Sequence, residues 1–233
     1  MNRGAKGRVM IKAVFIDYTG TTVKEDGEEI RDVVKRVCHN SDLHDPQAVL
    51  ALWWKRMKQY EENSYGENYL TEDEIVDKIL QSLVVEIHLK ENLRELHVLI
   101  RRSWVCAPAF PDAKEFFEKC PVPIYMISNN GIEYVKKGME DKQLQPEAII
   151  CADMVRAYKP HRELFERALE VSGCGADEVL HIGDSYSSDV LGARAAAIQP
   201  VLVQRTKGKT YDDVMTVQDL SEVLHLLDWG EAI

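Results

Sequence analysis

Short apolar segments that favour β-strands alternate with helical patterns over most of this chain. The strand-like segments lie at 12–16 (KAVFI), 122–127, 148–151, 178–182 and 200–203. Apolar residues at helical spacing predict helices at 111–119, 131–141, 161–172, 189–197 and 220–227. Strands that are joined through helices pair in parallel, and helices then cover both faces of the sheet. The alternation therefore predicts an α/β fold, with a parallel sheet between two layers of helices.

A block without strand patterns interrupts this alternation directly after the first predicted strand. Asp45 and Pro46 have the pattern of an N-cap and a first-turn proline, and 71–74 (TEDE) has the pattern of a capping box. A third helical pattern runs over 93–100. We therefore predict a smaller all-helical domain that is inserted into the core. The predicted boundaries are 24–105 for the helical domain and 1–23 with 106–233 for the core.

Charge and composition restrict the expected partners and compartment. The chain has 29 basic and 39 acidic residues, a formal net charge of −10, and an acidic surface repels a nucleic-acid backbone. No apolar run reaches the ~18 residues of a membrane helix, and the N-terminus lacks the apolar region of a signal peptide. Five scattered cysteines without a C-x-x-C pair favour reduced thiols over zinc or disulfides. We expect a cytoplasmic protein with no nucleic-acid or membrane partner; the sequence leaves its oligomeric state open.

Polar clusters follow the predicted strands of the core. They are 17–22 (DYTGTT), 128–131 (SNNG), 156–160 (RAYKP) and 183–189 (GDSYSSD). Ligands of open parallel sheets bind beyond the carboxyl ends of the strands, so we expect the four clusters to meet at one edge of the sheet.

Together, these clusters would supply a carboxylate nucleophile, a hydroxyl, an ammonium group and further carboxylates. Carboxylates can hold Mg²⁺, which prefers oxygen ligands. An ammonium group and Mg²⁺ can offset the charge of a transferring phosphoryl group, and an aspartate can attack phosphorus to form an acyl phosphate. The clusters therefore indicate phosphoryl-transfer chemistry.

With these four clusters in this order, the chain resembles the haloacid dehalogenase-like hydrolase superfamily. The insertion after the first strand matches the subfamily that carries a helical cap at this position. The resemblance implies a Rossmann-like core, a mobile cap, Mg²⁺ as cofactor and hydrolysis of a small phosphorylated metabolite through an aspartyl-phosphate intermediate.

The resemblance also implies roles for individual positions. The catalytic positions are Asp17, Thr19 and Lys159; the substrate-binding positions are Thr21, Ser128, Asn129 and Lys159; the metal positions are Asp17, Thr19, Asp184 and Asp189. Asp17 would be the nucleophile, and Thr19 would bind the metal through its backbone carbonyl. Lys159 would balance the charge of nucleophile and phosphate. Asp184 would bind the metal directly, and Asp189 would act through Lys159 or a metal-bound water.

One position departs from the phosphatases of this superfamily. They usually have D-x-D, in which the second aspartate is the general acid and base, whereas this chain has Thr19. A threonine hydroxyl does not change protonation state near neutral pH. Because a positioned acid or base contributes ~10²–10⁴ in rate, turnover is expected to be slow unless another group replaces it.

Two alternative functions remain open. The string DYTGTT is similar to DWAGTT of phosphonoacetaldehyde hydrolases, which cleave a C–P bond through a Schiff base on a cap lysine; Lys55 and Lys58 are candidates here. The other alternative is a non-catalytic phosphate- or partner-binding protein on the same fold. A haloacid dehalogenase would have tyrosine at the second position after the nucleophile, but Tyr18 is at the first, where strand alternation turns it away from the site.

Overall fold

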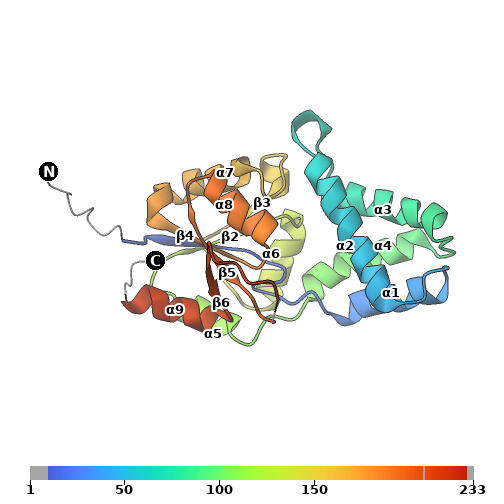
Figure 1. Cartoon of the computed structure of the whole chain (residues 1–233), viewed down its shortest axis with the longest axis horizontal. Helices are drawn as coiled ribbons and strands as arrows, with labels where there is room; N and C mark the ends of the chain where they lie inside the picture. Colours follow the sequence, from blue (N-terminus) through green and yellow to red (C-terminus); the bar gives the residue numbers. More distant parts are fainter. Residues whose placement is uncertain (1–9, 207, 230–233) are drawn as a thin grey trace, which may run out of the picture.

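The computed structural model describes residues 10–206 and 208–229 of the 233-residue chain. Within them, six parallel strands form one sheet in the order β3-β2-β1-β4-β5-β6 (Figure 1). The strands are β1 (Ala13–Ile16), β2 (Ile124–Ser128), β3 (Ala148–Cys151), β4 (Val179–Gly183), β5 (Gln199–Val203) and β6 (Met215–Val217). The central strand β1 pairs with β2 on one side and β4 on the other. The order therefore places the carboxyl ends of β1, β2 and β4 next to one another.

Helices cover both faces of the sheet, as the sequence predicts. Val14 and Ile16 of β1 pack on one face with α5 (Ala113–Lys119), α6 (Ile132–Asp141) and α9 (Leu220–Trp229). Ala13 and Phe15 face the other side, where α7 (Arg162–Ser172) and α8 (Leu191–Ala195) lie. Successive side chains of a strand point to opposite faces, so the uniformly apolar strand reflects burial on both sides. The α/β fold class is confirmed.

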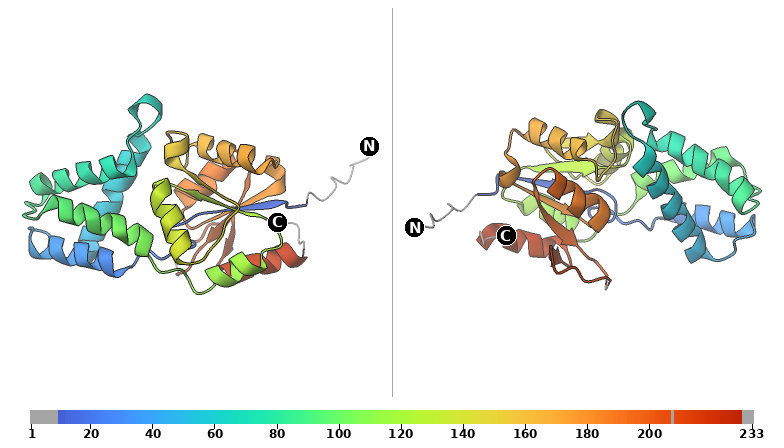
Figure 2. Two further views of the ribbon diagram at one scale, coloured as in Figure 1. Left: turned by 180° about the vertical axis from the view of Figure 1, so that it is seen from behind. Right: turned by 45° about the horizontal axis from the view of Figure 1, so that its top comes forward.

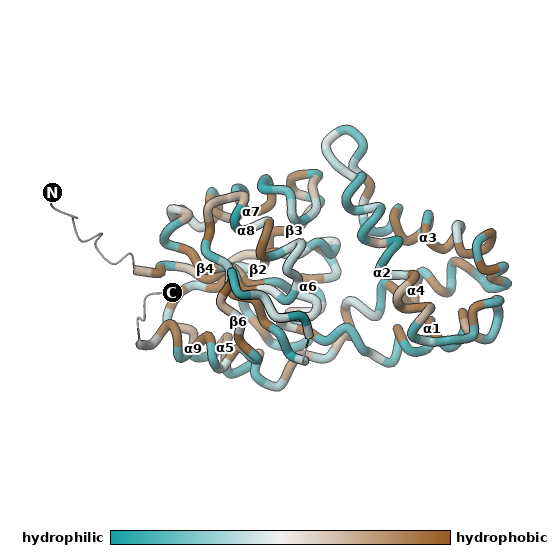
Figure 3. The backbone as a smooth tube through the Cα atoms, viewed as in Figure 1, coloured by the Kyte–Doolittle hydropathy of each residue, from teal (hydrophilic) through white to brown (hydrophobic). Residues whose placement is uncertain are grey.

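Four helices between β1 and α5 form a second block with its own apolar core. They are α1 (Glu28–His39), α2 (Pro46–Asn63), α3 (Glu72–Glu86) and α4 (Leu93–Cys106). Their inward faces bury a cluster that includes Trp53, Ile79 and Leu96, and the alternation of apolar and polar residues along the helices is visible in Figure 3. We refer to this block as the cap; Figure 2 shows it beside the core from two further directions.

Local signals explain where two of the cap helices begin. Asp45 accepts a hydrogen bond from the Gln47 backbone N–H at the start of α2. At the start of α3, the Thr71 hydroxyl accepts from the Glu74 backbone N–H, and the Glu74 carboxylate accepts from the Thr71 N–H. Both features agree with the sequence patterns.

The structure contains two elements that the sequence patterns do not predict individually. Helix α1 follows Gly27, which has no side chain to cap the helix. Strand β6 has only three residues, two of them exposed, at the edge of the sheet. In addition, a π-helical turn at Tyr186–Val190 precedes α8, whereas the sequence predicts a single helix over 189–197.

The cap contacts the core through the loop between α2 and α3. Tyr65 forms an isolated antiparallel bridge with Ala157, and its ring stacks on His161 with a centroid distance of 4.5 Å. The Tyr69 ring stacks on Tyr158 at 5.3 Å. These contacts place the end of α2 over the carboxyl edge of the sheet. In the described part of the chain, no helix is both long enough and apolar enough to cross a membrane.

Candidate active site

A pocket lies between the carboxyl edge of the sheet and the cap. Its volume is about 240 Å³. Seven of the eight predicted site residues line it: Asp17, Thr19, Ser128, Asn129, Lys159, Asp184 and Asp189. The structure thus brings the four polar clusters together in one pocket.

Asp17 and Lys159 form a buried ion pair at the centre of this pocket. Asp17 comes directly after β1, and its backbone N–H donates to the Ile182 carbonyl of β4 (2.9 Å), which fixes the end of the strand. The Lys159 ammonium Nζ lies 2.5 Å from Asp17 Oδ1 and 2.6 Å from Asp189 Oδ1. The Lys159 backbone N–H donates to Asn129 Oδ1 (2.7 Å). Lys159, which belongs to the 156–160 cluster, therefore contacts all three of the other polar clusters.

Burial and neighbouring charges set the ionisation of this group of residues. Burial and the charge of Asp189 outweigh the attraction of the ammonium group and raise the pKa of Asp17 to about 7. Burial lowers the pKa of Lys159, but the carboxylates of Asp17 and Asp189 hold it above its ordinary value. Burial opposes ionisation of Asp189 as well, but Lys159 and a hydrogen bond from His181 keep its pKa below the usual range. Lys159 is therefore a cation and Asp189 a carboxylate at neutral pH.

Asp189 uses both of its carboxylate oxygens for contacts within the protein. Oδ1 accepts from Lys159 and lies 3.0 Å from His181 Nε2, while Oδ2 accepts from the Ser185 backbone N–H (3.0 Å). A β-carbon on Gly183 would overlap the Asp189 side chain, so this close approach requires glycine. These contacts favour the indirect role for Asp189, in which it positions Lys159.

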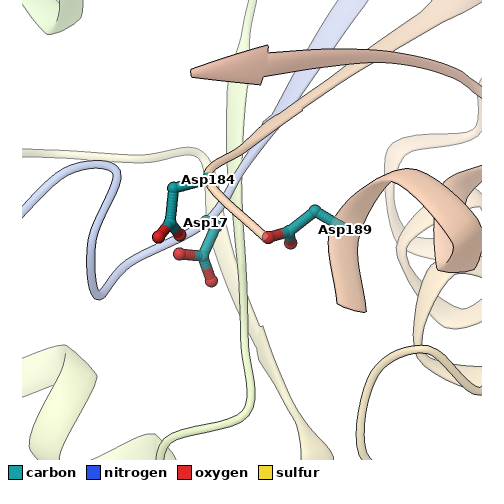
Figure 4. Close-up of side chains that lie close together, drawn as sticks. All are labelled: Asp17, Asp184 and Asp189. Atoms are coloured by element: carbon teal, nitrogen blue, oxygen red, sulfur yellow. The ribbon is translucent and has the colours of Figure 1, made fainter. Parts of the chain in front are cut away.

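Asp184 is exposed and points toward Asp17 (Figure 4). One carboxylate oxygen from each of Asp17, Asp184 and Asp189 lies within 4.8 Å of the other two. Within the described residues, no basic side chain forms an ion pair with Asp184. Although solvent reaches part of Asp184, the protein atoms packed around its carboxyl group, together with the charges of Asp17 and Asp189, raise its pKa well above the usual range. A cation at this point would relieve the repulsion.

This donor set fits a divalent metal ion such as Mg²⁺. Mg²⁺ is usually held by one or two carboxylates together with waters and substrate oxygens, and Asp17 and Asp184 can supply the carboxylates. Gly20, with φ of +87°, lies against Asp184, and a β-carbon there would overlap the carboxylate. The backbone of 19–20 is thus shaped to leave room beside Asp184, and the Thr19 carbonyl is a further candidate ligand in the same turn.

A hydrogen-bond network connects the core side of the pocket to the cap. The hydroxyls of Thr19 and Ser128 both donate to Asn130 Oδ1, at 2.7 and 3.1 Å. The Asn130 amide donates to Glu72 Oε1 (2.7 Å), and the Gly131 backbone N–H donates to Glu72 Oε2 (2.6 Å). Burial raises the pKa of Glu72 well above its usual range, although both hydrogen bonds oppose this shift. The sequence does not single out Asn130 or Glu72.

Thr21 is the one predicted site residue that does not line the pocket. It is fully buried, and its hydroxyl donates to Asp184 Oδ1 at 3.3 Å. Thr21 thus lies behind Asp184 and supports that side chain, and a substrate-binding role for Thr21 stays a prediction.

Several cap residues line the pocket without having been predicted as site residues: Glu25, Trp54, Met57, Glu61, Glu72 and Trp104. Glu61 follows Trp53 and Met57 at helical spacing, so an acidic residue that continues an apolar helix face was the available signal. Of the two candidate cap lysines, Lys58 lines the pocket and donates to Ser187 Oγ (3.3 Å), whereas Lys55 is exposed outside the lining.

Comparisons with known proteins agree on the family. The sequence profile of the haloacid dehalogenase-like hydrolases matches residues 11–197. A haloacid dehalogenase-like hydrolase domain-containing protein 3 from Danio rerio is 37% identical over 67 residues, which are 28% of each chain. A glyceraldehyde 3-phosphate phosphatase from Methanothermobacter thermautotrophicus is 28% identical over 89 residues, which cover 35% of this chain and 39% of the relative. The matches thus span well under half of these relatives.

The fold has close counterparts among solved structures. The L-2-haloacid dehalogenase of Xanthobacter autotrophicus superposes with a TM-score of 0.79 at 18% identity, covering 94% of this chain and 99% of the other. At this identity the likeness concerns the fold alone. Because the family profile covers most of the sequence, including every predicted site residue, the chain belongs to the haloacid dehalogenase-like hydrolases.

Proposed function

We propose that this protein is a Mg²⁺-dependent phosphohydrolase that acts on a small phosphorylated metabolite through an aspartyl-phosphate intermediate on Asp17. The observation that carries the proposal is the position of the Asp17 carboxyl between the ammonium group of Lys159 and the carboxylate of Asp184. A phosphate dianion needs positive charge on both sides, and this arrangement provides a fixed cation and a place for a second one. The phosphatase name of one relative agrees with this proposal.

Each residue of the pocket has a separate role in the proposed phosphoryl transfer. An Asp17 carboxylate oxygen attacks phosphorus, the bond to the leaving oxygen breaks, and an acyl phosphate forms. Lys159 holds the attacking carboxylate and balances the charge of the phosphoryl group, while the Ser128 hydroxyl lies at the pocket wall as a hydrogen-bond donor. When bound by Asp17 and Asp184, Mg²⁺ supplies charge stabilisation for the phosphoryl oxygens. Water then cleaves the acyl phosphate and restores Asp17.

The size of the pocket between cap and core supports the choice of a small substrate. Cap and core are joined on two sides of the pocket, by Lys58 with Ser187 and by Glu72 with Asn130. A volume of about 240 Å³ accommodates a phosphate ester of a few carbons. Exclusion of bulk water by the cap also strengthens the electrostatic interactions of Lys159. We therefore expect small phosphate esters to be better substrates than phosphorylated side chains on folded proteins.

Hydrolysis of a C–P bond is a second candidate, and the position of Lys58 is what favours it. The amine lies at the pocket rim, where it could form an imine with an aldehyde substrate. Borohydride reduction in the presence of phosphonoacetaldehyde would trap such an imine on Lys58. Lys55→Ala is the matched control, because Lys55 is on the same helix but outside the pocket.

A screen of small phosphate esters, with Mg²⁺ and with excess chelator, tests the main proposal. We expect Mg²⁺-dependent release of inorganic phosphate from a subset of the esters and none from Asp17→Asn. Binding of phosphate without release from any ester would instead support the non-catalytic alternative.

A further inference from the structure

Among the described residues on the core side of the pocket, every titratable side chain already has a role as nucleophile, metal ligand or ion-pair partner, so none is free to transfer a proton to the leaving oxygen. An alkoxide leaving group needs a proton, and the water that attacks the acyl phosphate must lose one. The Thr19 hydroxyl cannot serve both steps, and its hydrogen is already donated to Asn130 Oδ1 at 2.7 Å. If the proposed function holds, another titratable group must reach the leaving oxygen.

The direction of attack places that group on the cap. In an in-line displacement the attacking and leaving oxygens lie on opposite sides of phosphorus. Asp17 attacks from the edge of the sheet, so the leaving oxygen points away from the sheet and toward the cap helices. The acid must therefore come from the cap residues that line the pocket.

Glu61, in the last turn of α2, has the required placement. It lines the same pocket as Asp17 and Lys159. The Asn129 side chain lines the pocket with Glu61 and favours the ionised form of its carboxyl group, and Asn129 Oδ1 accepts from the Lys159 backbone N–H (2.7 Å). The Glu61 carboxyl group thus lies on the side of the pocket where Asn129 is fixed to Lys159. In the described part of the chain, Glu61 has no ion-pair partner that would explain its presence.

The other acidic residues of the cap are less suited to this step. Glu72 uses both carboxylate oxygens to accept from Asn130 and Gly131. Glu62 lies outside the pocket lining and pairs with Lys58 at 3.9 Å. Glu25 is exposed, and its charge acts on Asp184, on the side of the expected metal. Glu25 and Glu61 both line the pocket without an ion-pair partner among the described residues, but Glu61 is the less exposed of the two and lies within the influence of the Lys159 charge.

We propose that Glu61 is the general acid and base of this active site, in place of the aspartate that Thr19 replaces. As the bond between phosphorus and the leaving oxygen breaks, the Glu61 carboxylic acid gives its proton to that oxygen, and the alcohol departs. The Glu61 carboxylate then takes a proton from the water whose oxygen bonds to phosphorus. The bond between phosphorus and Asp17 breaks, inorganic phosphate leaves, and both side chains return to their starting states.

The electrostatic surroundings of Glu61 agree with this assignment. Burial raises its pKa to about 7, and the charges of Glu62 and Asp17 add to the shift, while Lys159 and Asn129 oppose it. Glu72 at the start of α3 and Tyr158 in the loop before α7 are also near enough for the charge of Glu61 to raise their pKa values. Glu61 can therefore be found in either protonation state near neutral pH, as both steps require.

The test compares Glu61→Gln with two matched variants, Glu62→Gln and Glu25→Gln. Each variant removes one carboxylate from the cap without changing side-chain size. The probes are p-nitrophenyl phosphate, whose leaving group needs no proton, and glycerol 2-phosphate, whose leaving group does. Thermal unfolding of each variant checks folding, and Glu61→Asp tests whether a shorter acid restores part of the rate.

We expect Glu61→Gln to lower kcat/KM for the alkyl ester by ~10²–10⁴-fold and for the aryl ester by less than about 10-fold. The fall of alkyl-ester kcat/KM above about pH 7, where the acid deprotonates, should disappear in this variant. In Glu62→Gln, the ratio of kcat/KM for the aryl ester to that for the alkyl ester should equal the ratio in the unaltered protein. Glu61→Asp should recover part of the kcat/KM for the alkyl ester that Glu61→Gln loses. The assignment would be overturned if Glu61→Gln left the aryl-to-alkyl ratio of kcat/KM unchanged. It would also be overturned if Glu25→Gln, and not Glu61→Gln, selectively lost activity on the alkyl ester. Either result would leave Asp17-dependent hydrolysis intact. Absence of any ester hydrolysis would overturn both proposals.

Discussion

Lys159 Nζ lies 2.5 Å from Asp17 Oδ1, and both side chains are almost completely buried. A buried charge that loses its partner is costly, because the remaining charge is neither hydrated nor paired. Asp189 depends on the same ammonium group. The pair therefore affects the stability of the fold as well as the chemistry of the site.

Lys159→Met should lower the free energy of unfolding of the metal-free protein by about 3–5 kcal/mol at neutral pH. The loss should shrink as pH falls and the carboxyl groups become protonated. Urea denaturation at several pH values measures it. Lys58→Met, which changes an exposed lysine of the same pocket, is the control and should have little effect on stability. Equal stability of the two variants would contradict the buried-pair account.

The stability of the metal-free protein should decrease as pH rises from about 4 through 7. The pKa values of Asp17 and Glu61 are raised to about 7 in the folded state, and that of Asp184 is also raised. Groups of this kind bind more protons in the folded state than in the unfolded state, so their contribution is present at low pH and is lost as they ionise. Urea midpoints of unfolding, measured in the presence of a chelator between pH 4 and 8, test this decrease of stability with pH. A stability that rises over this range would show that other groups dominate.

Asp184→Asn should separate the effect of the Asp184 carboxylate on stability from its effect on metal binding. Removing this carboxylate relieves its repulsion with Asp17 and Asp189, so the metal-free variant should be at least as stable as the unaltered protein. Added Mg²⁺ should raise the melting temperature of the unaltered protein and leave that of the variant nearly unchanged. Hydrolysis should be lost together with the metal response. Equal Mg²⁺ stabilisation of both proteins would remove Asp184 from the metal site.

Thr19→Asp should increase the turnover of alkyl esters relative to aryl esters. The new carboxyl group would stand at the position where related phosphatases have their acid, and a positioned acid contributes up to ~10²–10⁴ in rate. In the protein that keeps Glu61, the increase in alkyl-ester turnover should be smaller than this, because Glu61 already supplies the proton. Adding Thr19→Asp to Glu61→Gln should give a larger increase. Steady-state rates for both ester classes in the single and double variants check this. A double variant as slow on alkyl esters as Glu61→Gln alone would argue against proton transfer as the missing step.

Glu72→Gln should weaken the closure of the cap. Both oxygens of Glu72 accept hydrogen bonds, from the Asn130 amide and the Gly131 backbone N–H. In glutamine one of these oxygens is replaced by an NH₂ group, which cannot accept, so one of the two hydrogen bonds is lost. Hydrogen exchange should increase in the loop between α2 and α3, and KM should rise more than kcat falls. Glu86→Gln, at the far end of α3, is the control. Unchanged exchange in this loop would show that the contacts of Tyr65 and Tyr69 are sufficient to hold the cap.

Much of the fold follows from patterns within a few residues of one another. The capping box at Thr71 and Glu74 marks the start of α3, and the apolar run of β1 marks a strand buried on both faces. Helix α1 lacks such a signal, because Gly27 at its start offers no side-chain cap. Strand β6 is short and partly exposed, so it is stabilised by pairing with β5 and not by a strong apolar pattern of its own.

The core half of the site can be predicted because parallel strands end at a common edge. This rule brings Asp17, Ser128 and Asp184 together without knowledge of tertiary contacts. The cap half depends on how the cap docks. Glu61 reaches the pocket only because contacts such as the bridge between Tyr65 and Ala157 orient the end of α2, and no local pattern encodes that orientation.

The most direct test of the central claim is to detect a phosphoryl group on Asp17 during turnover. The Mg²⁺-loaded protein is mixed with p-nitrophenyl phosphate, quenched in acid within milliseconds to seconds, and analysed by intact and peptide mass spectrometry. We expect a mass increase of one phosphoryl group on the peptide that contains Asp17, lost on treatment with hydroxylamine, and no such product in Asp17→Asn. Release of p-nitrophenol by Asp17→Asn at the rate of the unaltered protein, with no acyl phosphate in either protein, would contradict it.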